Sequence, residues 1–175
     1  MRKIGQTLRF LIPVIALVAL VVFMTGAGRR ERAKLEKNKA IVRRNVDEFW
    51  NKGDMAVADE LYATDFVRHD PMLPEDIHGR ESLKKYVAAI HASSSDWHIT
   101  IEDVIAEGDK VAGRYTITGT STGEYMGIPP TGAPFTFSAI SIGRIIDGKI
   151  VETWNQSFDL GWMLPAGFKL IPPGE

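Results

Sequence analysis

The order of hydrophobic and polar residues divides the chain into an apolar amino-terminal segment and a longer part with helical and then strand-like patterns. Residues 10–27 read FLIPVIALVALVVFMTGA and contain no charged side chain. As a helix this segment would be about 27 Å long, close to the ~30 Å hydrocarbon core of a membrane. Basic residues lie on both sides of it, between Arg2 and Lys37. We therefore expect a membrane anchor with a basic juxtamembrane linker over residues 1–37.

A cleaved signal peptide is the alternative for this segment, because the small residues at 25–27 loosely match a cleavage site. The length of the apolar run and the basic cluster behind it favour a retained, single-pass anchor. Basic residues are about equal on both sides, so they do not fix the orientation. We expect the domain on the extracytoplasmic side, with secretion after signal cleavage or a cytoplasm-facing domain as alternatives.

Three segments after the linker carry apolar residues at helical spacing. The first covers residues 34–50, with charged side chains on the opposite face. A second, short helix follows Asp54, whose side chain can cap it. The third has its apolar stripe between Leu83 and Ile90 and ends at the polar run 93–96. The sequence thus predicts three amphipathic helices.

The apolar period changes to two beyond the third helix, which is typical of strands. Asp147-Gly148 is a strong hairpin signal between the last two of them. An α+β domain over residues 38–164 is expected, with a curved antiparallel sheet wrapped around the helices into a cone, followed by a tail over 165–175. The expected extended segments are 66–69, 97–102, 111–119, 135–146 and 149–158.

Composition narrows the chemistry. The 21 basic and 22 acidic residues give a net charge of −1, so nucleic acid is not an expected partner. The chain has no cysteine, which excludes disulfides, thiolate metal ligands and a cysteine nucleophile. His78, His91 and His98 lie on separate segments without metal-ligand spacing. No metal and no cofactor are expected.

Four segments of the domain resemble the SnoaL-like polyketide cyclases, also called the ester cyclase group, of the nuclear transport factor 2-like superfamily. They are NKAIVRRNVDEFWNKGD, DFVRHDP, EDVIAEGDKVAGRYTITGTSTGEYMGIPPTG and RIIDGKIVETWNQSFDLGW, in this order between residues 38 and 162. The resemblance implies a conical pocket and, as in characterised members, a cofactor-free intramolecular aldol condensation. It also implies an acid/base aspartate near the final helix, and Asp159 in FDLGW stands at the matching position.

The chain departs from the family pattern in two places. Arg144 stands where the second polar group of the cyclases, a histidine, would be sought, and LPAGFKLIPPGE replaces the usual amphipathic last helix. Both departures weaken the inference from family to cyclase chemistry.

Candidate site residues follow from the pattern around these motifs. Asp159 is the candidate base, with helix capping as the alternative, and His69 could orient or protonate a carbonyl. Arg114 and Glu152 are expected to point into the cone from their strands, where they could form a structural ion pair with each other or Arg114 could hold an oxyanion or carboxylate. The remaining ligand-binding candidates are Trp50, Trp154 and Gln156.

Three functions are compatible with these residues. The first is an enzyme that cyclises, isomerises or dehydrates a hydrophobic carbonyl compound. The second is a non-catalytic carrier or sensor of a lipophilic ligand taken from the membrane. The third, which the resemblance to the superfamily implies, is an interaction module that forms a homodimer through the outer face of its sheet.

Overall fold

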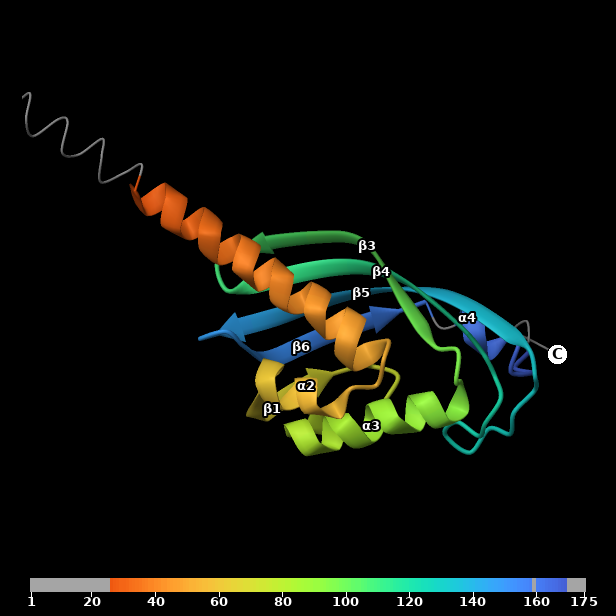
Figure 1. Cartoon of the computed structure of the whole chain (residues 1–175). Coiled ribbons are helices and arrows are strands. Elements are labelled where there is room, and N and C mark those ends of the chain that lie inside the picture. The colour runs from red at the N-terminus through yellow and green to blue at the C-terminus, as the bar shows by residue number, and fades with distance from the viewer. Residues whose placement is uncertain (1–25, 159, 170–175) are drawn as a thin grey trace, which may run out of the picture. The chain divides into compact units, whose positions relative to one another are not determined.

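The computed structural model describes residues 26–158 and 160–169. The chain divides into two compact units, Met1–Lys37 and Asn38–Glu175. The second unit contains all of the sheet (Figure 1).

The predicted membrane anchor, residues 10–27, lies outside the described residues except for its last two. In the described part of the chain, no helix is both long enough and apolar enough to cross a membrane. The helix over residues 26–44 is rich in charge, with Arg29, Arg30, Glu31 and Arg32 in its first turns. The prediction of a single-pass membrane protein is therefore corrected, and the apolar character expected of the amino-terminal helix is not confirmed.

The first predicted helix is longer than expected and changes its geometry before it ends. It is α-helical over residues 26–44 and continues as the π-helix η1 (Asn45–Trp50), where the Asn51 amide donates to the Val46 carbonyl at 2.9 Å. A π-helix bonds residues five apart and brings them to one side of the helix. Asn45 and Trp50 have this spacing, and both are buried.

The two further predicted helices are confirmed. Helix α2 (Met55–Leu61) begins at Asp54, whose carboxylate accepts from the Ala56 amide at 3.1 Å. Helix α3 (Arg80–Ser93) buries Leu83, Val87 and Ile90, the stripe that the pattern predicted. Helix propensity and capping thus determine these elements locally.

The sheet has six strands in the order β2-β1-β6-β5-β4-β3. The four long predicted strands are present, and Asp147 and Gly148 form the predicted turn with positive φ angles of 49° and 79°. The α+β class with a curved sheet is confirmed. The strands are β1 (Tyr62–His69), β2 (Ile77–His78), β3 (His98–Glu107), β4 (Lys110–Thr120), β5 (Pro134–Ile146) and β6 (Lys149–Ser157).

Two strand pairings go beyond the predicted meander. Strand β1 begins four residues earlier than expected and pairs in parallel with β6, where Arg68 is opposite Thr153 and His69 opposite Trp154. Strand β2 then adds antiparallel to β1. The β1–β6 pairing joins segments more than 80 residues apart, which a local pattern does not reveal.

The core lies between the helices and the half of the sheet nearest the Asp147 turn. Its fully buried members include Phe49, Tyr62, Phe66, Leu83 and Ile150. Phe49, Tyr62 and Phe66 pack edge to face, with successive ring centroids 5.6 and 4.7 Å apart. The short helix α4 (Leu160–Met163) closes against β5 at the other end of the sheet, where any Cβ on Gly161 would meet the Thr136 carbonyl oxygen.

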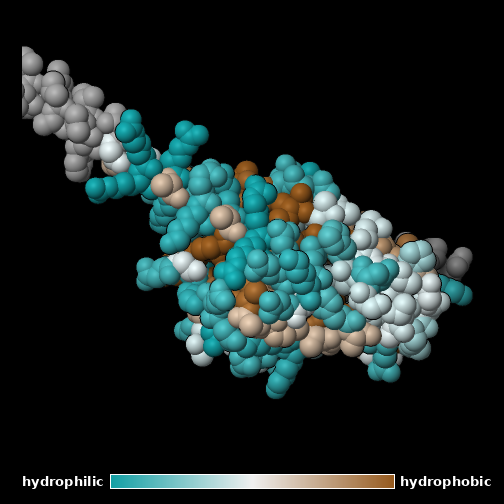
Figure 2. Space-filling view, in the orientation of Figure 1, coloured by the Kyte–Doolittle hydropathy of each residue, from teal (hydrophilic) through white to brown (hydrophobic). Residues whose placement is uncertain are grey.

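The face of the molecule in Figure 2 is mostly hydrophilic, and hydrophobic residues appear on it only in small patches. Large hydrophobic residues are nevertheless exposed elsewhere on the described domain, among them Ile105 and Ile140.

Candidate functional site

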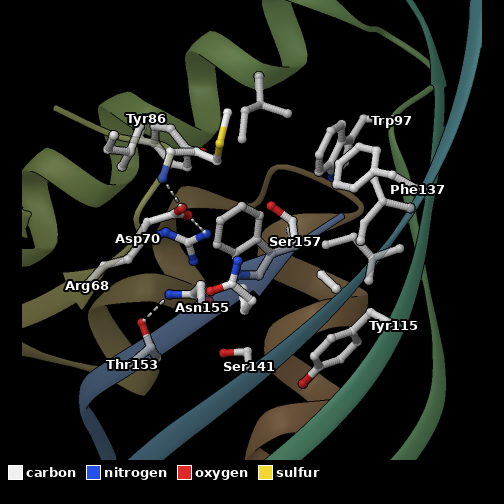
Figure 3. Close-up of a pocket in the computed structure, with 18 of the residues that line it drawn as sticks. Arg68, Asp70, Tyr86, Trp97, Tyr115, Phe137, Ser141, Thr153, Asn155 and Ser157 are labelled. Atoms are coloured by element: carbon white, nitrogen blue, oxygen red, sulfur yellow. Dashed lines mark hydrogen bonds and ion pairs between the residues drawn. The ribbon is translucent and has the colours of Figure 1, made fainter. Parts of the chain in front are cut away.

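A cavity of about 150 Å³ lies between the inner face of the sheet and the helices. Alternate residues of β4 and β5 form part of its wall, among them Tyr115 and Ile117 of β4 and Ser141 of β5. Figure 3 shows Tyr115 and Ser141 there. The cavity therefore occupies the place that the cone prediction expects for a pocket. The other wall residues used below are Asn45, Trp50, Tyr62, Arg68, Asp70, Tyr86, Trp97, Tyr125, Phe137, Ala139, Thr153, Asn155, Gln156, Ser157 and Trp162.

Arg68 and Asp70 form an ion pair at the end of β1. Arg68 Nη2 lies 2.7 Å from Asp70 Oδ2, and the two side chains are only 14% and 8% exposed. Asp70 also accepts from the Met72 amide at 3.1 Å, which closes the turn before the following loop. Among the described wall residues, Arg68 is the only cation and Asp70 the only carboxylate. A charge pair of this kind persists in a buried place because each ion compensates the other.

Two aromatic rings hold the Arg68 guanidinium. Its Cζ atom lies 5.3 Å from the ring centroid of Trp50 and 5.5 Å from that of Tyr86, within cation–π range. Trp50 ends the π-helix, and Tyr86 lies on α3. Helix geometry and ring stacking thus fix the position of the charge inside the cavity.

A polar strip on β5 and β6 lies beside this charge. Ser141 and Asn155 are directly paired across the two strands. Asn155 donates through Nδ2 to the His69 carbonyl at 3.1 Å and to Thr153 Oγ1 at 3.2 Å. Figure 3 shows Asn155, Thr153 and Ser141 on the same side of the cavity as Arg68. These bonds hold β1 and β6 together at the site.

Tyrosine hydroxyls supply further polar groups in an apolar setting. Burial raises the pKa of Tyr62 and of Tyr115 to about 12 each. Both remain neutral hydrogen-bond donors at physiological pH. Tyr115 lies flat along its strand because Gly113 has no side chain, and a Cβ there would lie 2.0 Å from the Tyr115 hydroxyl.

Three polar atoms of the wall residues are buried and have no hydrogen-bond partner among the described residues. They are Asn45 Oδ1, Arg68 Nε and Trp97 Nε1. An unpaired buried donor or acceptor costs about 1–3 kcal/mol, and such groups are rare in native structures. A site that is completed by a bound molecule gives a physical reason for them.

A second hollow of about 70 Å³ adjoins the cavity and is lined mainly by apolar residues. Trp97, Tyr125, Phe137 and Trp162 line both spaces. The second hollow is otherwise bordered by residues of the 121–133 loop, and by Ile90, Ser93, Phe135, Pro165 and Ala166.

The predicted site residue His69 lies on the opposite, outer face of the sheet. Its Nδ1 is 2.7 Å from Asp76 Oδ2, its Nε2 is 3.0 Å from Glu152 Oε1, and its ring stacks on Trp154. Arg144 donates to the other oxygen of Glu152 at 2.6 Å. The hydrogen bond to Glu152, together with Asp76, raises the pKa of His69, and the His69 and Arg144 bonds lower the pKa of Glu152.

The expected inward orientation of Arg114, Glu152 and Trp154 is wrong. Arg114 pairs with Asp103 at 2.7 Å with both side chains more than half exposed, and Trp154 is 37% exposed. Their neighbours at the next strand positions, including Tyr115 and Thr153, face the cavity instead. In β4 and β6 the inward-facing positions were predicted one residue out of phase. An error of one residue moves every side chain of a strand to the other face of the sheet.

The other predicted site residues have different outcomes. Trp50 and Gln156 line the cavity, and their contact with a ligand stays a prediction. Asp159 lies outside the described residues. The structure does not bring His69 or Arg114 into the cavity with Arg68.

Sequence reasoning missed Arg68 as a site residue. The signal was present in the motif FVRHDP, where residues 68 and 70 alternate with His69 and must face the other side of the strand. The motif indicated a histidine site, whereas the inward pair is Arg68 and Asp70.

No cluster of three or more His, Cys, Asp or Glu side chains suited to a metal ion occurs within residues 26–158 and 160–169. The wall residues offer aromatic rings, hydroxyls, three side-chain amides and one ion pair. This set is suited to a neutral organic molecule with a polar group at one end.

Comparison with protein families agrees with the geometry. The family model for the SnoaL-like polyketide cyclase matches residues 40–163. Aklanonic acid methyl ester cyclase DauD from Streptomyces sp. strain C5 is 27% identical over 148 residues, which cover 76% of this chain and 88% of DauD.

Solved structures of the same fold are similar throughout the domain. IdmH from Streptomyces antibioticus, a candidate polyketide cyclase, is 31% identical, with a TM-score of 0.64 over 75% of this chain and 99% of IdmH. A candidate SnoaL-like polyketide cyclase from Jannaschia sp. CCS1 has a TM-score of 0.71 at 22% identity, over 78% of this chain and 95% of its own. The second similarity concerns the fold alone.

Proposed function

The chain belongs to the SnoaL-like polyketide cyclase family, and from this premise we propose that its cavity binds a hydrophobic carbonyl compound and moves a proton on it without a cofactor. Family membership supports a cyclase or isomerase-type function. The reaction proposed for this chain is an intramolecular aldol cyclisation. Isomerisation and dehydration are its variants, because all three pass through an enolate.

The observation that carries the proposal is the Arg68–Asp70 pair inside an aromatic cavity. Removing a proton next to a carbonyl places negative charge on the carbonyl oxygen, and catalysis requires preorganised donors at that oxygen. Arg68 uses Nη2 for Asp70, while its Nη1 has no hydrogen bond among the described contacts. Arg68 is the donor that receives the oxyanion, and Asp70 holds it in place.

Asp159 is the proposed base, on the strength of the FDLGW motif. It is separated by one residue from Ser157 and by two from Trp162, and both of these line the cavity. A carboxylate works as a carbon-acid base when an apolar environment lifts its pKa. His69 and Glu152 have a structural role in this proposal, because each is engaged on the outer face.

Exchange of carbon-bound protons tests this chemistry without knowledge of the natural substrate. Acetophenone is incubated with the protein in D₂O, and deuterium entry into its methyl group is followed by NMR. The base removes one α-proton, Arg68 stabilises the enolate, and a deuteron from the exchanged base or solvent returns to the carbon. The protein should accelerate exchange over buffer alone.

Variants with a matched control test the proposed roles of Asp159 as base and Arg68 as oxyanion donor. Asp159→Asn and Arg68→Met should each slow the exchange about 100-fold or more, as expected for loss of a base or an oxyanion donor. Arg114→Met is the control, because Arg114 is an arginine of the same sheet on its outer face. Equal losses in Arg68→Met and Arg114→Met would reject the proposed site.

A second candidate is a carrier that binds such a compound without changing it. The Arg68–Asp70 pair favours this alternative, since the one carboxylate among the described wall residues is engaged by a guanidinium. A protein that binds acetophenone saturably but leaves its methyl protons unexchanged would be a carrier. Native mass spectrometry would then detect an unaltered co-purified ligand.

A homodimer through the outer sheet face is the proposed assembly. A row of paired positions, His69, Trp154, Ile142, Ala112 and Ile105, crosses the sheet there, and the two isoleucines are 39% and 70% exposed. Two pairs of charged neighbours of this row, Arg144–Glu152 and Arg114–Asp103, neutralise each other, and Lys110 lies over the Trp154 ring, which reduces the charge that a second copy would meet. Ile142→Lys should convert a dimer to a monomer in light scattering.

A further inference from the structure

We infer that the cavity selects a single-ring carbonyl compound with a short, linear apolar substituent, rather than a fused multi-ring compound. This inference rests on the proposed function and names its substrate class. It follows from the sizes of the two hollows, from the position of the charges, and from the aromatic residues that the hollows share.

The first hollow is the size of one ring. Its volume of about 150 Å³ is well below the 300–1,000 Å³ of pockets that hold drug-sized ligands. Engineered cavities of about 150 Å³ are known to hold benzene. A fused system of three or four rings would need the wall to move.

The charges fix which end of the ligand enters first. Among the described wall residues, the only ion pair is Arg68–Asp70, while Trp97 and Phe137 lie together at the opposite end (Figure 3). A carbonyl oxygen gains a charge-assisted hydrogen bond at Arg68, whereas the aromatic end offers only the neutral indole N–H of Trp97. The carbonyl therefore lies at Arg68, and the remainder of the ligand points towards Trp97.

The second hollow is best suited to apolar groups, and the Trp97 indole N–H on the wall that it shares with the first hollow is a neutral donor without a partner among the described residues. Its serine hydroxyls are already engaged, because Ser93 Oγ donates to the Ile90 carbonyl at 2.8 Å and Ser121 Oγ accepts from the Thr131 amide at 3.2 Å. With a volume of about 70 Å³ it is too small for another ring but has room for a short alkyl chain.

Aromatic residues narrow the passage between the hollows. Trp97 and Phe137 contribute a ring pair with centroids 6.1 Å apart, and Tyr125 and Trp162 contribute another at 5.9 Å. All four residues line both hollows. The part of a ligand that joins the two spaces must be as slim as an alkyl chain, which makes these residues the specificity determinants.

A series of phenyl ketones tests the inference by calorimetry. Acetophenone, propiophenone, butyrophenone and valerophenone differ by one methylene each, and 9-acetylanthracene supplies three fused rings. Affinity should rise about fourfold per methylene, the effect of burying a CH₂ group, until the second hollow is full. 9-Acetylanthracene should bind at least 100-fold more weakly than butyrophenone.

Three variants and one control test which residues cause the dependence of affinity on chain length and ring number. Ala133→Leu and Ala166→Leu, each at the second hollow, should abolish the gain with chain length and leave acetophenone binding unchanged. Ala89→Leu is the control on the exposed side of α3 and should retain the whole series. Phe137→Ala removes one side of the passage and should raise the affinity for 9-acetylanthracene at least tenfold.

The outcomes separate this inference from the function on which it rests. If wild-type protein binds every ketone regardless of ring number and chain length, the size selection is wrong and the site stands. If Ala133→Leu and Ala166→Leu leave the series unchanged, the second hollow is not the chain site. Failure of the protein to bind any of the ketones would overturn the proposed function as well.

Discussion

The two faces of the sheet carry similar side chains in different surroundings. On the inner face Arg68 pairs with Asp70 beside Trp50, and both charges are mostly buried. On the outer face Arg144 pairs with Glu152 beside His69 and Trp154, at an open groove bordered by the 70–76 loop. Each face thus combines an arginine, a carboxylate and a tryptophan.

Burial separates the two sets in function. A guanidinium surrounded by apolar rings acts strongly on a developing charge, because water does not screen it. The same group at the surface competes with solvent and salt, and exposed pairs contribute little. The face of the sheet on which a cluster lies therefore indicates a functional site better than the residue types that the cluster contains.

Breaking the ion pair on each face should give the largest difference between the two faces in the free energy of unfolding. Asp70→Ala leaves Arg68 buried without its partner and also removes the acceptor of the Met72 amide. The free energy of unfolding should fall by about 3 kcal/mol, measured by urea denaturation. Glu152→Ala on the outer face should change it far less. A similar loss in both variants would refute the contrast between the faces.

Substitution of two inner-face glycines on neighbouring strands should give the next largest difference in stability. Gly113→Ala places a methyl group where the Tyr115 ring lies, and overpacking of this kind costs about 1–3 kcal/mol. Gly143→Ala is the matched control, because its Cβ meets only Thr153 Cγ2, at 3.8 Å. It should be close to neutral in thermal denaturation. Acetophenone affinity should fall in Gly113→Ala, since the displaced ring enters the cavity.

The outer-face cluster of His69, Glu152 and Arg144 should produce the smallest effect, a dependence of protein stability on pH. The pKa of His69 is raised above its ordinary value of 6.5, so its stabilising contribution is complete below 6.5 and is lost as pH rises through the raised pKa. The pKa of Glu152 is lowered from 4.5, so its contribution is complete above 4.5 and is lost as pH falls through the lowered pKa. Both are complete between pH 4.5 and 6.5.

Melting temperatures recorded from pH 3 to 9 check this window. The difference in Tm between wild type and Glu152→Gln should be greatest between pH 4.5 and 6.5 and should shrink on both sides. The other charges near His69 are Asp76, which bonds its Nδ1, and Arg144, which bonds Glu152. A difference that is constant across the pH range would show that the cluster does not titrate with folding.

Local patterns predicted the elements of this fold well. Asp54 caps α2, and the apolar stripe of α3 is buried, because capping and amphipathicity act within a few residues. The Asp147-Gly148 turn follows from the freedom of these two residues to adopt positive φ. The parallel pairing of β1 with β6 depends on distant segments, and no local pattern encodes it.

The phase of the strands shows why the site was harder to predict. In β4 the inner residues, such as Val111, Tyr115 and Ile117, are more apolar than Arg114 and its neighbours, so the correct face could have been chosen. In β6 the inner residues Thr153 and Asn155 are polar because they line a cavity, while Trp154 faces outward. Hydrophobicity alone therefore misleads on the strand that forms the site.

A crystal structure with bound 4-bromoacetophenone tests the central claim directly, because the anomalous signal of bromine locates the ligand. The ketone oxygen should lie within hydrogen-bond distance of Arg68, with the bromine towards Trp97 and Phe137. A bromine peak in the outer groove against Trp154, with an unchanged inner cavity, would contradict the assignment of the inner face as the site.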